Sequence, residues 1–351
     1  MTRNEWRLAL QIAFTYIGTV VGAGFASGQE ILQFFTMLGP WAYPGILLAT
    51  FFFAWVGTKI LMLGRKLNAR SYREMTSYLF GGKIAAVIDT FMMVMLFFVT
   101  VAMLAGVGAL FEEQLRLSFQ VGVLITMVLT FLTILRGMKG IMLANSIIVP
   151  IMMIVVITIF IQSFFQTDHV PQMVATKPDV TAWSFIFSGI SYAALNLGLA
   201  VSVLVPLGGE IEKPRVLRIG GLLGALGLGL MLIGAQYAMS TRMPMILEYE
   251  VPMGFLASTF NPVMQALFVM ALWGEIYSTL IANVFGLSTQ MITPRKQSHG
   301  ALITILILTA AFFVAQVGFS NIVHYLYPIF GHLSFVLLLM LLWPRSLKPK
   351  K

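Results

Sequence analysis

The sequence has no cysteine, and only four of its 351 residues are histidine. Without cysteine the chain forms no disulfide and offers no thiolate to a metal ion. Its histidines lack the close spacing of metal ligands, since they stand at His169, His299, His324 and His332. Charged side chains occupy only 10% of positions, and no nucleophile–base motif is present. These absences argue against an enzyme, a metal centre and an organic cofactor.

Hydrophobic residues make up 59% of the chain, and the mean hydropathy is +0.91, far outside the range of soluble domains. A helix needs about 20 apolar residues to cross the hydrocarbon core of a bilayer. Ten windows of sufficient length occur, which predicts an all-α polytopic membrane protein with ten transmembrane helices. The windows lie near residues 8–36, 41–64, 84–111, 117–135, 140–165, 182–208, 217–240, 262–291, 300–319 and 321–343.

The formal charge of +9 is compatible with nucleic-acid binding, but the distribution of the basic residues indicates a different cause. With both termini in the cytoplasm, 19 of the 22 lysines and arginines lie on the cytoplasmic side, and only Arg116, Lys177 and Arg242 lie outside. This asymmetry is the positive-inside rule. We therefore expect a multi-pass protein of the cell membrane, with the lipid bilayer and no nucleic acid as its partner. No sequence signal indicates an oligomeric state.

The ten windows divide into two sets of five that resemble each other weakly, one in residues 1–168 and one in 179–345. The first span of each half is interrupted by glycine, at 18–28 and 188–198. Between the second and third spans of each half lies a piece long enough for a surface helix, at 71–80 and 251–260; a capping box of Ser71 and Glu74 opens the former. Because five is odd, the second half must be inverted relative to the first. Paired interruptions in inverted repeats indicate a transporter's binding site, so we expect helices 1 and 6 to be interrupted.

The first span contains four glycines, Gly18, Gly22, Gly24 and Gly28, where a helix should run unbroken through lipid. Each glycine lowers helix propensity by about 1 kcal/mol relative to alanine. A membrane span tolerates such weakness only where protein or a water-filled cavity satisfies the freed backbone groups. A break near mid-depth indicates a site for a small solute or ion. The alternative is that these GxxxG pairs only allow close helix packing.

The run Gly18-Thr19-Val20-Val21-Gly22-Ala23-Gly24 resembles the unwound first helix of the amino acid–polyamine–organocation superfamily, which has the LeuT-type five-plus-five inverted-repeat fold. The longer string through Phe25-Ala26-Ser27-Gly28-Gln29-Glu30 is similar to the YkvI-type bacterial membrane proteins, a branch of that superfamily. The resemblance in span number, orientation and loop helices covers nearly the whole chain. It implies a secondary transporter that works by alternating access, rocking a bundle against a scaffold, with no substrate assigned.

Unwinding near Gly22 would free the carbonyls of Gly18 and Val21 at the end of the inner half-helix, whose negative dipole end suits a cation. In the eighth span, Ser278 and Thr279 resemble that helix's part of the superfamily's sodium site. The resemblance therefore implies that Gly18, Val21, Ser278 and Thr279 hold a coupling ion through oxygen donors. Alternatively, the two hydroxyls bond to carbonyls of their own helix.

The outer half-helix would begin with free amides, and its positive dipole end suits an anion such as an amino acid carboxylate. In the sixth span, several polar side chains would face the same cavity. The candidate solute-binding residues are Gly22, Ala23, Gly24, Phe25, Ser27, Ser191, Tyr192 and Asn196. The alternative for the sixth span is a polar stripe that seals one helix against its neighbours.

Three acidic residues, Glu30, Asp89 and Glu275, lie within predicted spans. A charge at the bilayer centre costs at least about 2.5–3.5 kcal/mol, so each needs a partner, a cavity or a proton. Glu30 and Glu275 are candidates to carry a coupling proton, and they are equally compatible with recognition of a cationic solute or with a structural role. For Asp89 we expect an interfacial salt bridge with Lys83, about one turn away, and the alternative is a role in transport.

Together these features predict an ion-coupled symporter of a small zwitterionic solute, above all an amino acid. The coupling ion is Na⁺ or H⁺, and Na⁺ is favoured because no lysine in the middle of span five supplies a fixed charge. The alternative is a solute-sensing membrane receptor or accessory protein with the same fold and no transport. A channel is disfavoured because no ring of charges or repeated filter motif appears.

The predicted topology is tested by cysteines introduced into this cysteine-free chain at Thr176 and Lys350. In intact cells an impermeant thiol reagent should label Thr176→Cys and spare Lys350→Cys, because the first lies in a predicted outer loop and the second in the predicted cytoplasmic tail. Labelling of the Lys350→Cys variant in intact cells contradicts the topology.

Overall fold

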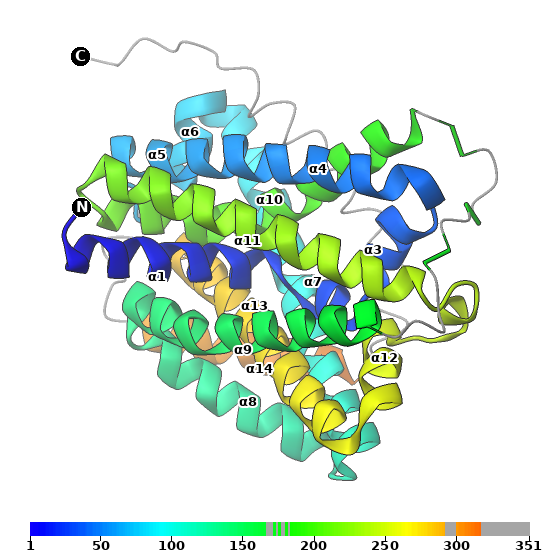
Figure 1. The fold of residues 1–351 in the computed structure, drawn as a ribbon. Coiled ribbons are helices and arrows are strands. Elements are labelled where there is room, and N and C mark those ends of the chain that lie inside the picture. Colours follow the sequence, from blue (N-terminus) through cyan, green and yellow to red (C-terminus); the bar gives the residue numbers. More distant parts are fainter. Residues whose placement is uncertain (166–170, 173–174, 177–179, 182, 292–299, 317–351) are drawn as a thin grey trace.

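The computed structural model describes residues 1–165, 171–172, 175–176, 180–181, 183–291 and 300–316. Within these residues the regular elements are helices, and one isolated antiparallel bridge joins Leu38 to Ala175. The elements shown in Figure 1 are α1 (Arg3–Val20), α2 (Ala23–Ser27), α3 (Gln29–Ile31), η1 (Leu32–Thr36), η2 (Gly39–Trp41), α4 (Ala42–Phe52), η3 (Phe53–Gly57), α5 (Thr58–Leu67), α6 (Tyr72–Phe80), α7 (Gly82–Leu115), α8 (Phe119–Ile134), α9 (Gly137–Phe165), α10 (Ser184–Glu210), α11 (Pro214–Ser240), η4 (Met245–Glu248), α12 (Pro252–Phe260), α13 (Pro262–Met291) and α14 (Gly300–Ala315).

Six of the described helical segments are long and apolar enough to cross a membrane. They are Gly39–Leu67, Gly82–Leu115, Gly137–Phe165, Ser184–Glu210, Pro214–Ser240 and Pro262–Met291. Two shorter apolar helices, α8 and α14, coincide with the predicted windows at 117–135 and 300–319. The tenth window, 321–343, lies outside the described residues, so the ten-helix count and the five-plus-five repeat stay predictions.

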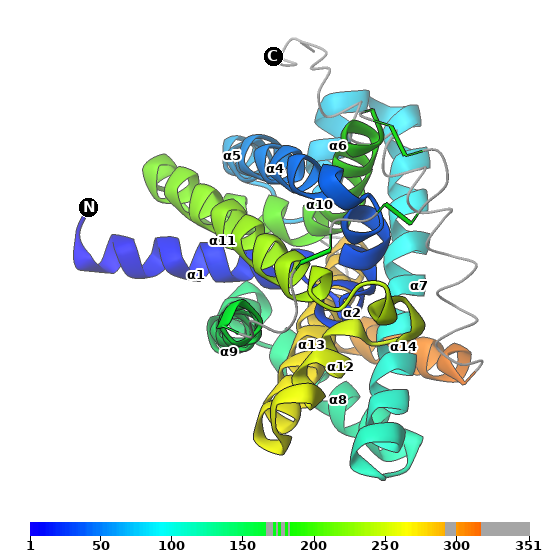
Figure 2. The ribbon, with the colours of Figure 1, turned by 45° about the vertical axis from the view of Figure 1, so that its right-hand side comes forward.

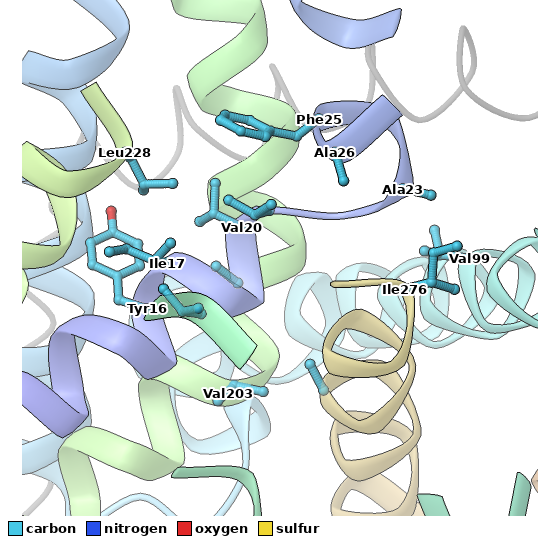
Figure 3. Close-up of a cluster of buried hydrophobic side chains, with 14 of the residues drawn as sticks. Tyr16, Ile17, Val20, Ala23, Phe25, Ala26, Val99, Val203, Leu228 and Ile276 are labelled. Atoms are coloured by element: carbon cyan, nitrogen blue, oxygen red, sulfur yellow. The ribbon is translucent and has the colours of Figure 1, made fainter. Parts of the chain in front are cut away.

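The first span is interrupted, as expected from its glycines. α1 ends at Val20, the backbone is extended through Val21 and Gly22, and α2 begins at Ala23. Figure 3 shows the thin connection that leads from Val20 to Ala23. The half-helix beyond the break is not continuous, however, because Gly28 adopts a left-handed conformation with φ +91°. A Cβ at Gly28 would also lie 2.9 Å from the side chain of Met253 in α12, so this second bend depends on glycine.

The sixth span is not interrupted, so this expectation was wrong. α10 is one helix from Ser184 to Glu210. A Cβ at Gly189 would lie 2.6 Å from the carbonyl oxygen of Gly45, which shows that this glycine allows α10 to approach α4. Asn196 Nδ2 donates to the Tyr192 carbonyl of its own helix at 3.0 Å. The glycines and polar residues of this span therefore serve close packing and side-chain contacts within an intact helix.

The two surface helices lie where the sequence predicts them. α6 follows a capping box in which the Ser71 amide donates to Glu74 Oε2 at 3.1 Å. α12 covers nearly all of the predicted segment at 251–260. Asp89 in α7 accepts from the Thr76 hydroxyl of α6 at 2.6 Å and lies 3.8 Å from Arg73 Nε. Its ion-pair partner is Arg73 of α6, so the expected pairing with Lys83 was wrong, and the Gln290 side chain of α13 also contacts the carboxylate.

α1 lies between two groups of helices (Figures 1 and 2). On one side it packs against α10 and α11, which in turn contact α4 and α5. On the other side it packs against α9 and α13, which contact α7, α8 and α14 in several pairings. The break in α1 is therefore surrounded by both groups. At the N-terminal end of α1, Lys213 Nζ lies 2.6 Å from Glu5 Oε1, and this contact lowers the pKa of the Glu5 carboxyl.

Glycines allow two helices of the first group to meet backbone to backbone. A Cβ at Gly64 in α5 would overlap the Val205 carbonyl oxygen of α10. Reciprocally, a Cβ at Gly208 in α10 would overlap the Leu61 carbonyl oxygen of α5. Because no side chain separates the two backbones at these glycines, the axes of α5 and α10 lie close together. Small residues have the same effect at helix interfaces in other membrane proteins.

A buried hydrogen bond joins α1 to the π-helical turn η3. Tyr16 is fully buried, and its hydroxyl donates to the Phe53 carbonyl at 2.8 Å. Gly57, at the end of η3, has no Cβ, and a Cβ there would overlap the Tyr16 hydroxyl. The π-helical turn and the glycine together leave room for the tyrosine.

Gly57→Ala should therefore destabilise the protein by about 1–3 kcal/mol, since the new methyl group forces the buried Tyr16 ring to move. Gly82→Ala is the matched control, because nothing lies within 4 Å of a Cβ at Gly82. Thermal aggregation of the purified protein in detergent measures both variants. Equal midpoints for the two would show that the packing around Tyr16 accommodates a methyl group at position 57.

Candidate functional site

The break in α1 brings the four predicted cation ligands together. Ser278 Oγ of α13 donates to the Gly18 carbonyl oxygen at 2.8 Å, and Thr279 Oγ1 donates to the Val21 carbonyl oxygen at 3.1 Å. Ser278 is fully buried and Thr279 is 5% exposed. Both hydroxyls thus bond across to α1 and not to carbonyls of their own helix, the alternative that the sequence left open. The carbonyls are available because α1 stops before it forms another turn.

Asn145 of α9 joins this cluster, although the sequence analysis did not identify it. Its side chain is fully buried, and its Oδ1 lies 2.6 Å from Ser278 Oγ. Its Nδ2 donates to the Ile141 carbonyl of α9 at 2.9 Å, which directs the amide oxygen toward Ser278. A carboxamide within the long apolar run of α9 was the available sequence signal.

The cluster has more acceptor oxygens than protons. The Ser278 hydroxyl has one proton, so it donates to either Gly18 or Asn145 and leaves the other oxygen close to it without a proton between them. Two oxygens at hydrogen-bond distance without a shared proton repel each other, and a bound cation removes that repulsion. The arrangement is chemically suited to an alkali cation held by neutral oxygens.

Glycine at position 18 is required for this convergence. A Cβ there would overlap Asn145 Oδ1 and would lie 2.8 Å from Ser278 Oγ. α1, α9 and α13 therefore meet at Gly18, with its carbonyl in the cluster. At Gly22 a Cβ would lie 3.3 Å from Thr279 Oγ1. The face of α13 that carries Ser278 and Thr279 therefore contacts the chain both before and within the break.

The predicted solute-binding residues of the first span differ in accessibility. Ala23 and Phe25 are buried, at 6% and 1% exposed, whereas Gly22, Gly24 and Ser27 are partly accessible. This alternation shows that one face of the segment borders a space large enough for solvent. α2 has only five residues, so the dipole available to a carboxylate at its start is small.

In the sixth span the structure separates the predicted residues into two places. Tyr192 and Asn196 lie near Glu30: the Asn196 side chain donates to the Glu30 carboxylate, and Tyr192 is close enough to interact with its charge. Ser191 lines a pocket of about 510 Å³ between η1 and the start of α10. Ser188 lines the same pocket and donates to the Phe34 carbonyl.

The two predicted proton carriers are in different positions. Glu275 precedes Ser278 by one turn of α13, is fully buried, and has no hydrogen-bond partner for either carboxylate oxygen in the described part of the chain. Glu30 has one such unpartnered oxygen, Oε2. A buried carboxylate without a partner is accommodated when it is protonated or lies beside a cation.

The fold is similar to the folds of several solved transporters. MhsT in complex with L-phenylalanine matches with a TM-score of 0.66 at 16% identity, over 95% of this chain and 87% of MhsT. A Na⁺-coupled sialic acid symporter, in a substrate-bound outward-open state, matches with a TM-score of 0.65 at 13% identity, over 93% and 75% of the two chains. Mhp1, a nucleobase-cation-symport-1 family transporter, gives 0.55 at 11% identity, over 95% and 75%. The chain is thus a multi-pass membrane protein with a LeuT-type fold.

The sequence comparisons place the chain more narrowly, although no protein-family model matches it. The uncharacterized membrane protein YkvI of Bacillus subtilis (strain 168) is 36% identical over 328 residues, which is 93% of each chain. The uncharacterized protein YyaD of the same organism is 26% identical over 338 residues, 96% of this chain and 97% of YyaD. The protein belongs to the YkvI family of membrane proteins, and the resemblance inferred from residues 18–30 is confirmed.

Proposed function

We propose that the protein is a secondary active transporter that carries a small zwitterionic solute, an amino acid, in symport with Na⁺ by alternating access. The observation that carries the proposal is the convergence of oxygens at the break in α1, from Gly18, Val21, Asn145, Ser278 and Thr279. Solved transporters of this fold include a Na⁺-coupled symporter and a protein that holds L-phenylalanine, which supports both the ion and the solute class.

Na⁺ fits the cluster better than a divalent ion does. All five donors are neutral, namely two carbonyls, two hydroxyls and one carboxamide. Sites for divalent cations in proteins ordinarily include carboxylates. The residue of α9 that reaches the cluster is Asn145, which is neutral. No basic side chain at that position supplies a fixed positive charge in place of a bound cation.

The solute lies beside the ion in this proposal, against the partly accessible backbone of Gly22 and Gly24. A break whose backbone groups are free on one side supplies both donors and acceptors to a zwitterion. Glycine permits the ligand to approach the main chain closely. The residues on either side of the break then couple the two binding events, because the same segment contacts both ligands.

One observation favours H⁺ as the alternative coupling ion. Glu275 lies on the same face of α13 as Ser278 and Thr279, and both its carboxylate oxygens are buried without a partner. A proton on Glu275 removes the cost of its buried charge, and release and uptake of that proton during the cycle would couple solute movement to H⁺. Transport coupled to Na⁺ follows a Na⁺ gradient, whereas transport coupled to H⁺ follows a pH gradient.

For the cation site, Na⁺ added to protein purified in choline buffer should raise the thermal unfolding midpoint, as a ligand that binds only the folded state does. Asn145→Ala and the double variant Ser278→Ala, Thr279→Ala should each weaken the apparent Na⁺ affinity at least about tenfold, because each removes oxygen donors to a charge. Ser146→Ala is the matched control, since its hydroxyl bonds to the Met142 carbonyl of its own helix. A Na⁺ response that survives both site variants places the ion elsewhere.

For transport, purified protein in sealed vesicles should accumulate an amino acid when Na⁺ is higher outside, and Gly22→Leu should abolish accumulation, because its side chain enters the space at the break beside Thr279. Uptake of radiolabelled amino acids, with Na⁺ replaced by choline, is the measurement. Uptake that follows a pH gradient, ignores choline replacement and is lost in Glu275→Gln establishes H⁺ as the coupling ion. Solute binding without accumulation shows that the protein is a sensor.

A further inference from the structure

Glu30 holds a buried carboxylate oxygen for which the described part of the chain supplies no cationic partner. Its Oε2 atom is buried and has no hydrogen-bond partner in the described part of the chain. Neither residues 22–36 nor α10 contains a lysine or an arginine. A carboxylate within a membrane span that lacks a cationic side chain is expensive unless a cation from outside the chain binds there.

The bend at Gly28 directs this carboxylate to the solute side of the break. A Cβ at Gly24 would lie 2.7 Å from both Cγ and Cδ of Glu30, so the glutamate side chain lies directly over the Gly24 backbone. Gly24, Ser27 and Glu30 are partly accessible, whereas the neighbouring Phe25, Ala26 and Ile31 are buried. Glu30 thus borders the accessible space next to the break, with its Oε2 atom buried toward the protein.

Two polar groups of α10 and a set of aromatic rings complete the surroundings. The Asn196 side chain donates to Glu30, and the Tyr192 hydroxyl, in a fully buried side chain, has no hydrogen-bond partner in the described part. The Tyr192 ring lies 5.3, 5.0 and 6.0 Å, centroid to centroid, from the rings of Phe34, Phe35 and Phe53. A carboxylate, a hydroxyl and aromatic faces are the groups that bind an ammonium ion.

Building on the function proposed above, we propose that Glu30 and Tyr192 bind the ammonium group of the transported solute. The ammonium donates to Glu30 Oε2 and to the Tyr192 hydroxyl oxygen. The Asn196 side chain, which donates to Glu30, keeps the carboxylate in position. The unpartnered oxygens of Glu30 and Tyr192 are then both satisfied. The solute class is a primary amine, with or without a carboxylate.

This assignment gives the site a selectivity rule based on charge. An acid without an amine brings a second negative charge next to Glu30, and like charges in a weakly polar site repel strongly. An amine without a carboxylate keeps its contact with Glu30. It lacks only the contacts that an amino acid's carboxylate would make with the backbone at the break. The site therefore selects solutes by their amine more than by their acid.

Two matched sets of probes test the rule in thermal-shift titrations of the full-length protein in Na⁺ buffer. The first set is L-leucine, isoamylamine and isocaproate, and the second is L-phenylalanine, phenethylamine and hydrocinnamate. In at least one set the amino acid and the amine should bind, and the acid should bind at least about tenfold more weakly. Glu30→Gln should weaken amine binding at least about tenfold, as loss of a charge-assisted bond does. Tyr192→Phe should weaken it less, because the ring remains.

Glu113→Gln, at the end of α7, is the matched control for loss of an acid, and Glu30→Asp, which keeps the charge, should bind amines better than Glu30→Gln. A retained Na⁺ shift shows that each variant is folded. If an acid binds as tightly as its amine, or if Glu30→Gln binds amines like the unmodified protein, the inference is wrong while the proposed transporter stands. If none of the six probes binds while Na⁺ still stabilises the protein, the amino acid substrate of the proposed function fails, and the inference falls with it.

Discussion

The structure depends on one constraint: backbone groups released by a break in a membrane helix must find partners without water. α1 stops at Val20, and the carbonyls of Gly18 and Val21 lose the helical donors that a further turn would have supplied. Hydroxyls from α13 take their place. The requirement draws α13 and, through Asn145, α9 to the same point, so the helix that is broken is also the helix around which the others are assembled.

The same constraint explains which parts of the site the sequence predicts. Glycines at 18, 22, 24 and 28 weaken the first span so strongly that a break was expected, and the structure has it. Ser278 and Thr279 were found through the family resemblance, since adjacent hydroxyls on an apolar helix are ambiguous on their own. Asn145 was missed because its role depends on which helices are neighbours, and a single sequence does not contain that information.

The sixth span shows where glycine patterns mislead. Glycine lowers helix propensity by about 1 kcal/mol wherever it occurs, yet it also permits close approach between helices, and the two effects have the same sequence signature. At Gly189 the close approach to Gly45 prevails, and α10 is continuous. The tertiary contact decides the outcome, so propensity alone predicted the break in α1 and wrongly predicted one in α10.

The backbone contacts of Gly64 with Val205 and of Gly208 with Leu61 have a mechanical meaning. Helices that touch main chain to main chain have no side chains between them that could change rotamer and let one slide past the other. We therefore expect α5 and α10 to move as one rigid unit, so that the access change of the proposed transporter would involve contacts elsewhere. The surface helices α6 and α12 join the chain from α5 to α7 and from α11 to α13. Each therefore connects a helix of one group around α1 to a helix of the other.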